Sequence, residues 1–371
     1  MLIKNGIVFI DGKFNHLDIL IENGKIVEIS PTIQGDANID ATNKIIFPGF
    51  IDLHIHGANF VNCWDGEEAV RTISKALPQY GVTGYYPTLR ANDVDKSVAG
   101  IRGIRKAKDG EGAKILGVHL YTGYRNRSIA YYNIRQKPSI EHTLALCDND
   151  MSDIKIALCA PELEGGSEWI KWISKQGIVA EIGFSEGTAT QMQEAADYGA
   201  TLTDHFFNGF PLMDHHEDGS TIGCLLEDRL YITLNCDCIH VAKSFIQLAI
   251  RTKGINKIIA VSDSSTFVGA KEGTYVRDDN KVVIVKDGAV RDENGKLVTG
   301  AHSYDENMRT MLAHGFTLEE IGTIFSENAA KVMKLNDRGK IEVGRVGDLV
   351  IMDQQLNINQ TIMDGFVVFK K

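Results

Sequence analysis

The fold is decided by Pro48-Gly49-Phe50-Ile51-Asp52-Leu53-His54-Ile55-His56-Gly57, which reads as an apolar strand ending in two histidines and a glycine. Side chains two residues apart in a strand point to the same face, so both imidazoles project together from one strand end. Imidazole is a common ligand of divalent metal ions in proteins. The stretch therefore predicts half of a metal site, whose remaining ligands must come from elsewhere in the chain.

Further apolar segments follow this strand, separated by segments that carry helix formers at helical spacing. The strand candidates are residues 50–56, 82–88, 115–120, 154–160, 178–183, 200–205, 230–236 and 257–263. Eight strands alternating with helices predict an α/β fold, a (β/α)8 barrel of the TIM type. A doubly wound open sheet would also alternate, but no G-x-G-x-x-G loop follows the first strand. After the eighth strand, residues 275–299 predict an inserted hairpin and 304–334 predict helices.

Both ends of the chain read as short strands joined by turns. Asp11-Gly12 and Asn23-Gly24 are hairpin-turn dipeptides between apolar runs near the N-terminus. Short strands also occupy 348–352 and 366–369 near the C-terminus. We therefore expect a small β-domain built from residues 1–47 and 340–371, beside a barrel formed by residues 48–339.

The composition is that of an ordinary globular protein, with 371 residues, 43% of them hydrophobic and 24% charged. The formal net charge of −10 argues against a general nucleic-acid or membrane-surface binder. The six cysteines form no C-x-x-C pair, which predicts reduced thiols. No signal peptide is evident, and no apolar run approaches the ~20 residues of a membrane-spanning helix. We expect a cytoplasmic protein whose partners are neither nucleic acid nor membrane.

In such barrels the catalytic groups lie at the carboxyl ends of the strands, so the residue at or just past each strand end is informative. These residues are His54 and His56, Thr88, Tyr121, Glu162, Phe184, His205, His240 and Asp263. Histidine and aspartate together suit a borderline divalent ion such as zinc. Asp263 is also suited to take a proton from a metal-activated water.

At this point the chain resembles the amidohydrolase superfamily and, within it, the N-acetylglucosamine-6-phosphate deacetylases. The segments that carry the resemblance are spread over most of the chain. They are Pro48-Gly49-Phe50-Ile51-Asp52 with His54 and His56, Gly117-Val118-His119-Leu120, Ala160-Pro161-Glu162, Asp204-His205-Phe206-Phe207-Asn208, Asp237-Cys238-Ile239-His240-Val241, Ser262-Asp263 and Val346-Gly347-Asp348-Leu349-Val350.

The resemblance implies a distorted (β/α)8 barrel with a β-sandwich formed by both termini. It also implies one or two divalent metals and a water that attacks the N-acetyl carbonyl of an amino-sugar phosphate. The products would be acetate and the free amino-sugar phosphate. Relatives of this kind are commonly dimers, so the resemblance implies a homodimer.

Carried over by position, the resemblance also implies roles for individual residues. His54 and His56 would hold one metal, and His205 would be a ligand of the other. Asp263 would be the general base and then the acid for the leaving amine. His240 and the backbone of Asn208-Gly209 would bind the phosphate.

The chain departs from the family pattern at three positions. The family has a glutamate ligand where this sequence has Tyr121, and a histidine ligand where it has Phe184. The histidine that polarises the substrate carbonyl corresponds to Asn133, which we assign to substrate binding. Phenylalanine cannot bind zinc, and a neutral tyrosine is a poor ligand.

His54, His56 and Asp263 are left as ligands, which is enough for one catalytic zinc ion with an open position. Iron, manganese or no metal are the alternatives. His205 would be a fourth ligand or a proton shuttle. Tyr121 either donates a hydrogen bond to the developing oxyanion or fills the pocket that the second metal would occupy.

Two alternative roles also stay open for each of the charged residues near the predicted metal site. Arg125 and Arg127 follow the third strand and are predicted to bind an anionic group of the substrate, the alternative being a solvated loop. Glu162 either orients a ligand histidine from outside the ligand set or makes a structural hydrogen bond.

The sequence thus predicts a metal-dependent amidohydrolase that deacetylates an N-acetyl amino-sugar phosphate such as N-acetylglucosamine 6-phosphate. Two alternatives stay open. The scaffold could hydrolyse a different amide or sugar-phosphate substrate, or the protein could be a non-catalytic sugar-phosphate-binding homologue.

Overall fold

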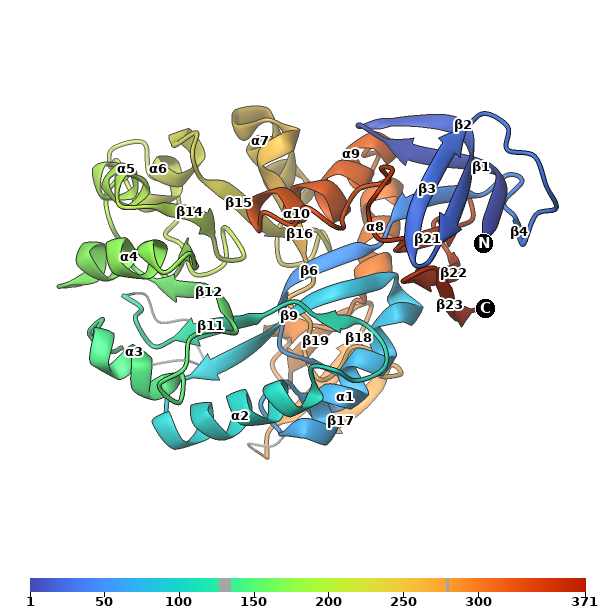
Figure 1. The fold of residues 1–371 in the computed structure, drawn as a ribbon. Helices are drawn as coiled ribbons and strands as arrows, with labels where there is room; N and C mark the ends of the chain where they lie inside the picture. Colours follow the sequence, from blue (N-terminus) through green and yellow to red (C-terminus); the bar gives the residue numbers. More distant parts are fainter. Residues whose placement is uncertain (127–134, 278–279) are drawn as a thin grey trace.

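The computed structural model describes residues 1–126, 135–277 and 280–371, which form a barrel flanked by a terminal β-domain (Figure 1). The barrel strands run parallel in chain order, each bonded to the next. They are β6 (Phe50–Ile55), β9 (Val82–Ala91), β11 (Val118–Thr122), β12 (Ile154–Cys159), β13 (Val179–Ile182), β14 (Ala200–Thr203), β15 (Tyr231–Asn235) and β16 (Ile258–Val261). The predicted (β/α)8 barrel is confirmed.

The last barrel strand returns to the first. Ile55 and Ser264 form a parallel bridge, and the Asp263 amide donates to the His54 carbonyl over 2.9 Å. This closure sets the ends of β6 and β16 side by side. His54 and Asp263, which are some two hundred positions apart in the sequence, are therefore neighbours in the barrel mouth.

Helices surround the barrel and complete its core. They are α1 (Glu67–Ala76), α2 (Val94–Ala107), α3 (Ile140–Leu146), α4 (Gly166–Lys175), α5 (Ala189–Asp197), α6 (Ser220–Leu226), α7 (Lys243–Lys253), α8 (Tyr304–Ala313), α9 (Leu318–Gly322) and α10 (Asn328–Val332), with a π-helical turn at Thr323–Glu327. Their starts follow local rules: Thr188 and Gln191 form a capping box at α5, and Asp93 caps α2. The main core lies between strands and helices, where Ile101 and Ile104 of α2 belong to the same buried cluster as Leu89 of β9.

The two ends of the chain share one sheet, with the order β23-β22-β21-β5-β1-β2-β3 and β4 paired to β1. Its strands are β1 (Leu2–Ile10), β2 (Lys13–Glu22), β3 (Lys25–Ser30), β4 (Ile39–Asp40), β5 (Ile45–Pro48), β21 (Leu349–Met352), β22 (Ile358–Met363) and β23 (Phe366–Lys370). Asp11-Gly12 and Asn23-Gly24 all have positive φ, as type I′ hairpin turns require. The predicted terminal β-domain is confirmed, while its boundaries at residues 47 and 340 stay predictions.

The insertion after β16 is larger than the hairpin predicted for residues 275–299. It is a four-stranded antiparallel sheet of β17 (Gly273–Val276), β18 (Val282–Lys286), β19 (Ala289–Asp292) and β20 (Leu297–Gly300). Both outer strands are four residues long, β17 mostly exposed and β20 half-buried along its length, so their apolar alternation is too weak to read from the sequence. Two two-residue strands, β7 (Gly57–Ala58) and β8 (Val61–Asn62), follow β6, and β10 (Lys114–Ile115) pairs with β9.

Among the residues that the structure describes, no helix has the length and apolar character needed to cross a membrane.

Candidate active site

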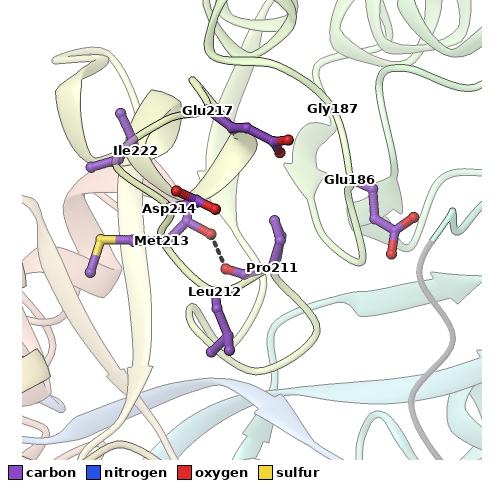
Figure 2. A pocket seen from close by; sticks show the side chains of 10 residues that line it. Glu186, Gly187, Pro211, Leu212, Met213, Asp214, Glu217 and Ile222 are labelled. Atoms are coloured by element: carbon purple, nitrogen blue, oxygen red, sulfur yellow. Dashed lines mark hydrogen bonds between the residues drawn. The ribbon is translucent and has the colours of Figure 1, made fainter.

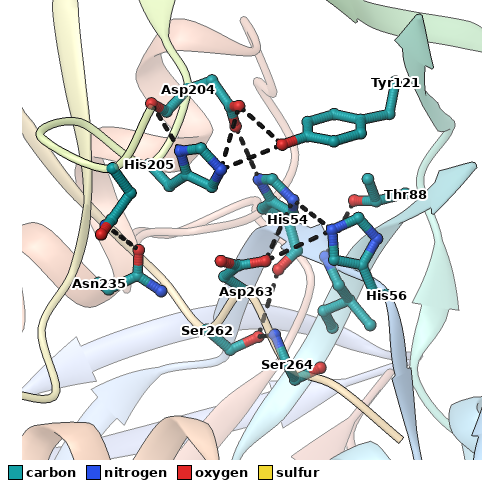
Figure 3. A network of polar contacts seen from close by, with 12 residues as sticks. His54, His56, Thr88, Tyr121, Asp204, His205, Asn235, Ser262, Asp263 and Ser264 are labelled. Carbon is teal, nitrogen blue, oxygen red and sulfur yellow. Dashed lines mark hydrogen bonds and ion pairs between the residues drawn. The ribbon is translucent and has the colours of Figure 1, made fainter. Parts of the chain in front are cut away.

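Three of the predicted ligands meet at the barrel mouth (Figure 3). His54 Nε2 lies 3.0 Å from His56 Nε2, and each of these nitrogens lies 3.4 Å from Asp263 Oδ1. The first histidine is buried and the aspartate side chain is 19% exposed, so the cluster opens toward solvent on the aspartate side. Three residues that we predicted from their positions at strand ends therefore do converge in space.

The turn after each strand directs these side chains. Phe184, His205 and Asp263 are each the second residue past the end of β13, β14 and β16, and their φ angles are 50°, 21° and 46°. Non-glycine residues rarely adopt positive φ, and such strain tends to collect at functional sites. The hydrogen bond from the Asp263 amide to the His54 carbonyl holds the aspartate backbone in this positive-φ conformation.

The separations within the cluster fit a divalent ion. Bonds of ~2.1 Å in a tetrahedral site place neighbouring ligand atoms about 3.4 Å apart. The observed edges of 3.0, 3.4 and 3.4 Å are close to that value. Two imidazoles and one carboxylate form a donor set that zinc accepts. His54, His56 and Asp263 could therefore hold the metal.

The charges around the cluster also favour a cation at its centre. Burial lowers the pKa of His54, but the carboxylates of Asp263 and Asp204 outweigh burial and raise it to about 9. Burial and the positive charge of His54 hold the pKa of His56 well below its usual value. The two imidazoles thus share one positive charge, which lies beside the Asp263 carboxylate.

Asp204 is a functional candidate that the sequence analysis missed. Its Oδ1 lies 3.0 Å from His54 Nδ1, and its Oδ2 accepts a 3.0 Å hydrogen bond from Tyr121 Oη. Burial raises its pKa, but the charges of His205 and His54 outweigh burial and hold the pKa well below the usual value. The sequence did carry a signal for this residue, because Asp204 directly follows a buried strand. We took the next residue, His205, as the strand-end candidate.

His205 lies outside the three-residue cluster. Its Nε2 is 3.0 Å from Tyr121 Oη and 3.4 Å from Asp204 Oδ2, and its ring stacks on that of His54 with centroids 5.5 Å apart. Its assignment as a metal ligand stays a prediction.

Tyr121 is a neutral phenol in this environment. Burial and the charge of Asp204 raise its pKa well above the usual value, and the nearby Arg125 offsets only part of that shift. A neutral phenol donates a hydrogen bond but is a poor ligand. Its hydroxyl donates to Asp204 Oδ2, and both roles considered for Tyr121, oxyanion donor and space-filling aromatic, stay predictions.

A second buried pair lies beside the cluster and was not expected. His119 Nε2 is 2.8 Å from Glu181 Oε2, and His119 Nδ1 is 3.2 Å from Thr88 Oγ1. Burial and the charge of His54 lower the pKa of His119 to about 3, while burial and Asp204 raise that of Glu181 well above its usual value. Burial thus favours the uncharged form of each group, and the His119 ring packs edge-on against that of His54.

Arg125 is buried, with its guanidinium stacked on aromatic rings. Its Cζ lies 4.2 Å from the ring centre of Tyr121 and 4.5 Å from that of Phe184, and its Nε donates to the Thr122 carbonyl. The alternative of a solvated loop is wrong for this residue, because only 2% of it is exposed. The predictions for Arg127 and Asn133 lie outside the described residues.

Glu162 contacts the neighbouring loops. It accepts hydrogen bonds from Asn126 Nδ2, Ser185 Oγ and the Glu186 amide at 3.0, 2.7 and 2.6 Å. These contacts favour the structural hydrogen bond that we kept as the alternative for this residue.

The residues predicted to bind phosphate lie at the ends of β14 and β15. His240 Nδ1 is 2.5 Å from Asp237 Oδ2, and this carboxylate outweighs burial to raise the pKa of His240. Asn208 Nδ2 donates to Asn235 Oδ1 over 3.2 Å. Gly209 has a φ of 76°, and an added Cβ would lie 2.9 Å from the Phe184 ring, so the chain needs glycine there. The raised pKa favours the protonated form of His240, which suits an anionic group.

A cavity of about 200 Å³ opens beside this region, between the loops that follow β13 and β14 (Figure 2). Its described lining includes the carboxylates of Glu186, Asp214 and Glu217 and none of the predicted site residues. Three carboxylates repel a phosphate, so this cavity does not suit the anionic end of a sugar phosphate.

Comparison with known proteins agrees with this geometry. The model of the amidohydrolase family matches residues 45–368. N-acetylglucosamine-6-phosphate deacetylases of Lysinibacillus sphaericus and Bacillus subtilis are each 29% identical to the chain, over 98% and 99% of its length and 97% and 94% of theirs. The N-acetylglucosamine-6-phosphate deacetylase structure from Thermotoga maritima has a TM-score of 0.85 and 28% identity, with 100% of both chains covered. The protein belongs to the amidohydrolase family.

Proposed function

We propose that the protein is a metal-dependent deacetylase of N-acetyl amino-sugar phosphates, such as N-acetylglucosamine 6-phosphate. The observation that carries the proposal is the convergence of His54, His56 and Asp263 at the mouth of an amidohydrolase barrel. The names of the full-length relatives support the substrate class. The donor set favours one zinc ion, and the family resemblance favours a homodimer.

Each residue of the site would have a different role in hydrolysis. A divalent ion held by His54, His56 and Asp263 would supply the Lewis acid that makes water a nucleophile near neutral pH. Asp263 would take the proton of the attacking water and deliver it to the amine nitrogen that leaves as the carbon–nitrogen bond breaks. The hydroxyl of Tyr121 donates to Asp204 Oδ2 in the structure, and during the reaction its one hydrogen would turn toward the oxyanion that forms on the carbonyl oxygen.

The phosphate would be held away from the reacting carbonyl. His240, whose pKa is raised, and the Asn208-Gly209 backbone would bind it together with the buried guanidinium of Arg125. Arg127 and Asn133 are proposed to contribute to the same subsites. Glu162 would hold the adjacent loops in place rather than contact substrate.

A specific observation favours keeping a second candidate function. Tyr121 and Phe184 occupy the positions of two family ligands, and they pack against each other with ring centroids 5.9 Å apart. The altered pocket could accept a different amide or sugar-phosphate substrate. Alternatively, the protein could bind a sugar phosphate without turning it over.

Metal analysis paired with an acetate-release assay tests the proposal. We expect about one equivalent of zinc, iron or manganese in protein purified without chelator, and acetate release from N-acetylglucosamine 6-phosphate. Chelation should abolish the release and zinc should restore it, because the water is activated only when an ion is bound. Bound metal without acetate release would favour the different-substrate candidate. A trace of metal, with no gain on adding zinc, would favour the binding protein.

Zinc binding should release about one proton at pH 7.5. The pKa of His54 is raised to about 9, so this imidazole carries a proton at pH 7.5 that a bound metal must replace. Affinity should therefore fall about tenfold for each pH unit below this pKa, because protonated His54 cannot ligate. Calorimetry in buffers of different ionisation enthalpy measures the proton count. A count of zero would contradict the assignment of His54 as a ligand.

A further inference from the structure

The contact between Asp204 and His54 carries an inference that rests on the proposed metal site. We propose that Asp204 is the positioning residue of this site: its carboxylate fixes the proton of His54 on Nδ1 and thereby aims the Nε2 lone pair at the metal. The two groups lie 3.0 Å apart, and both are buried (Figure 3).

The geometry of His54 requires one particular tautomer for metal binding. A neutral imidazole carries its proton on only one nitrogen, and the other nitrogen is the ligand. His54 Nε2 is the atom that faces His56 Nε2 and Asp263 Oδ1. A carboxylate accepts a hydrogen bond but cannot donate one, so Asp204 Oδ1 places the proton on Nδ1. Carboxylate contacts of this kind orient ligand histidines and raise their basicity.

Further contacts hold Asp204 itself in place. Tyr121 Oη donates to its Oδ2 over 3.0 Å, His205 Nε2 lies 3.4 Å from the same oxygen, and His205 Nδ1 lies 3.1 Å from its backbone carbonyl. A buried carboxylate needs such partners, since an isolated one is costly in a protein interior. Tyr121 and His205 thus support the proposed metal site through Asp204.

The substitution Asp204→Asn separates a positioning role from a merely structural one. The amide has the shape of the carboxylate but can donate to His54 Nδ1, which would force the proton onto Nε2. We expect Zn²⁺ affinity, measured by competition with a chelator, to fall 10- to 100-fold. Long-range ¹⁵N NMR of zinc-free protein above pH 9 should show His54 shifting from the Nδ1–H to the Nε2–H tautomer.

Asp237→Asn is the matched control, because Asp237 makes the same type of buried contact with His240. It should leave Zn²⁺ affinity unchanged. Tyr121→Phe removes only the hydroxyl that donates to Asp204 and should weaken Zn²⁺ binding by a smaller factor without changing its stoichiometry. This second variant keeps the inference testable if Asp204→Asn does not fold, as judged by circular dichroism.

Unchanged Zn²⁺ affinity and an unchanged His54 tautomer in folded Asp204→Asn would overturn the inference while leaving the proposed reaction intact. For Tyr121→Phe, an affinity equal to that of the wild type would do the same. Conversely, weaker Zn²⁺ binding in the Asp204 variant of a protein that releases no acetate would support the inference and refute the proposed reaction.

Discussion

Asp263→Asn is expected to lower kcat for acetate release by at least about a thousandfold. The amide of asparagine cannot accept a proton from water or return one to the leaving amine. It is also a weaker metal ligand than a carboxylate, so two functions of the residue are lost together. Asp263 Oδ1 lies 3.4 Å from the Nε2 atoms of both His54 and His56, so the same carboxylate can hold the metal and take the proton.

Measurements of rate, zinc content and ligand binding are needed together to interpret this variant. Binding of glucosamine 6-phosphate, followed by calorimetry, should stay within a fewfold of the wild type, because the phosphate subsite near His240 is unchanged. Asp109→Asn is a suitable control, since it neutralises an exposed aspartate that belongs to neither group of possible metal ligands among the described residues. Activity of zinc-loaded Asp263→Asn within tenfold of the wild type would contradict its assignment as the general base.

The sequence predicted the barrel well because its strands are short, buried and nearly continuous in apolar character. The rule that catalytic groups lie at strand ends then placed His54 and Asp263 together, although they are far apart in the chain. The rule holds here because the barrel closes. Ile55 at the end of β6 pairs with Ser264 just past β16, so the two strand ends lie side by side. A single-sequence pattern was therefore sufficient for the three-residue cluster.

The residues that support this cluster could not be predicted in the same way. Asp204, His119 and Glu181 are buried polar groups whose partners lie on other strands. Those contacts depend on the stagger between neighbouring strands, which a hydrophobic pattern does not determine. The family resemblance also implies that Tyr121 and Phe184 stand at ligand positions, but the stacking of Arg125 on both rings depends on a loop conformation. Local signals thus identified the three residues that converge at the barrel mouth and missed the buried polar groups that contact them.

Removing a ligand histidine should have a far larger effect on metal binding than removing His205. We expect His54→Ala and His56→Ala each to abolish stoichiometric zinc binding, because two protein ligands do not make a catalytic zinc site. His205→Ala should only weaken it, since His205 Nε2 contacts Tyr121 and Asp204 rather than the cluster. Metal analysis after dialysis against a weak chelator provides the comparison.

The two ligand variants should differ from each other in stability. His54→Ala leaves the buried Asp204 carboxylate without one of its partners, which should lower the free energy of unfolding by about 3 kcal/mol. His56→Ala removes a ligand that makes no contact with Asp204 in the described hydrogen bonds and ion pairs, so its effect on zinc-free protein should be smaller. Denaturant unfolding of the zinc-free variants measures both values. Equal loss of zinc in His54→Ala and His205→Ala would instead place His205 among the ligands, because only a ligand should matter as much as His54.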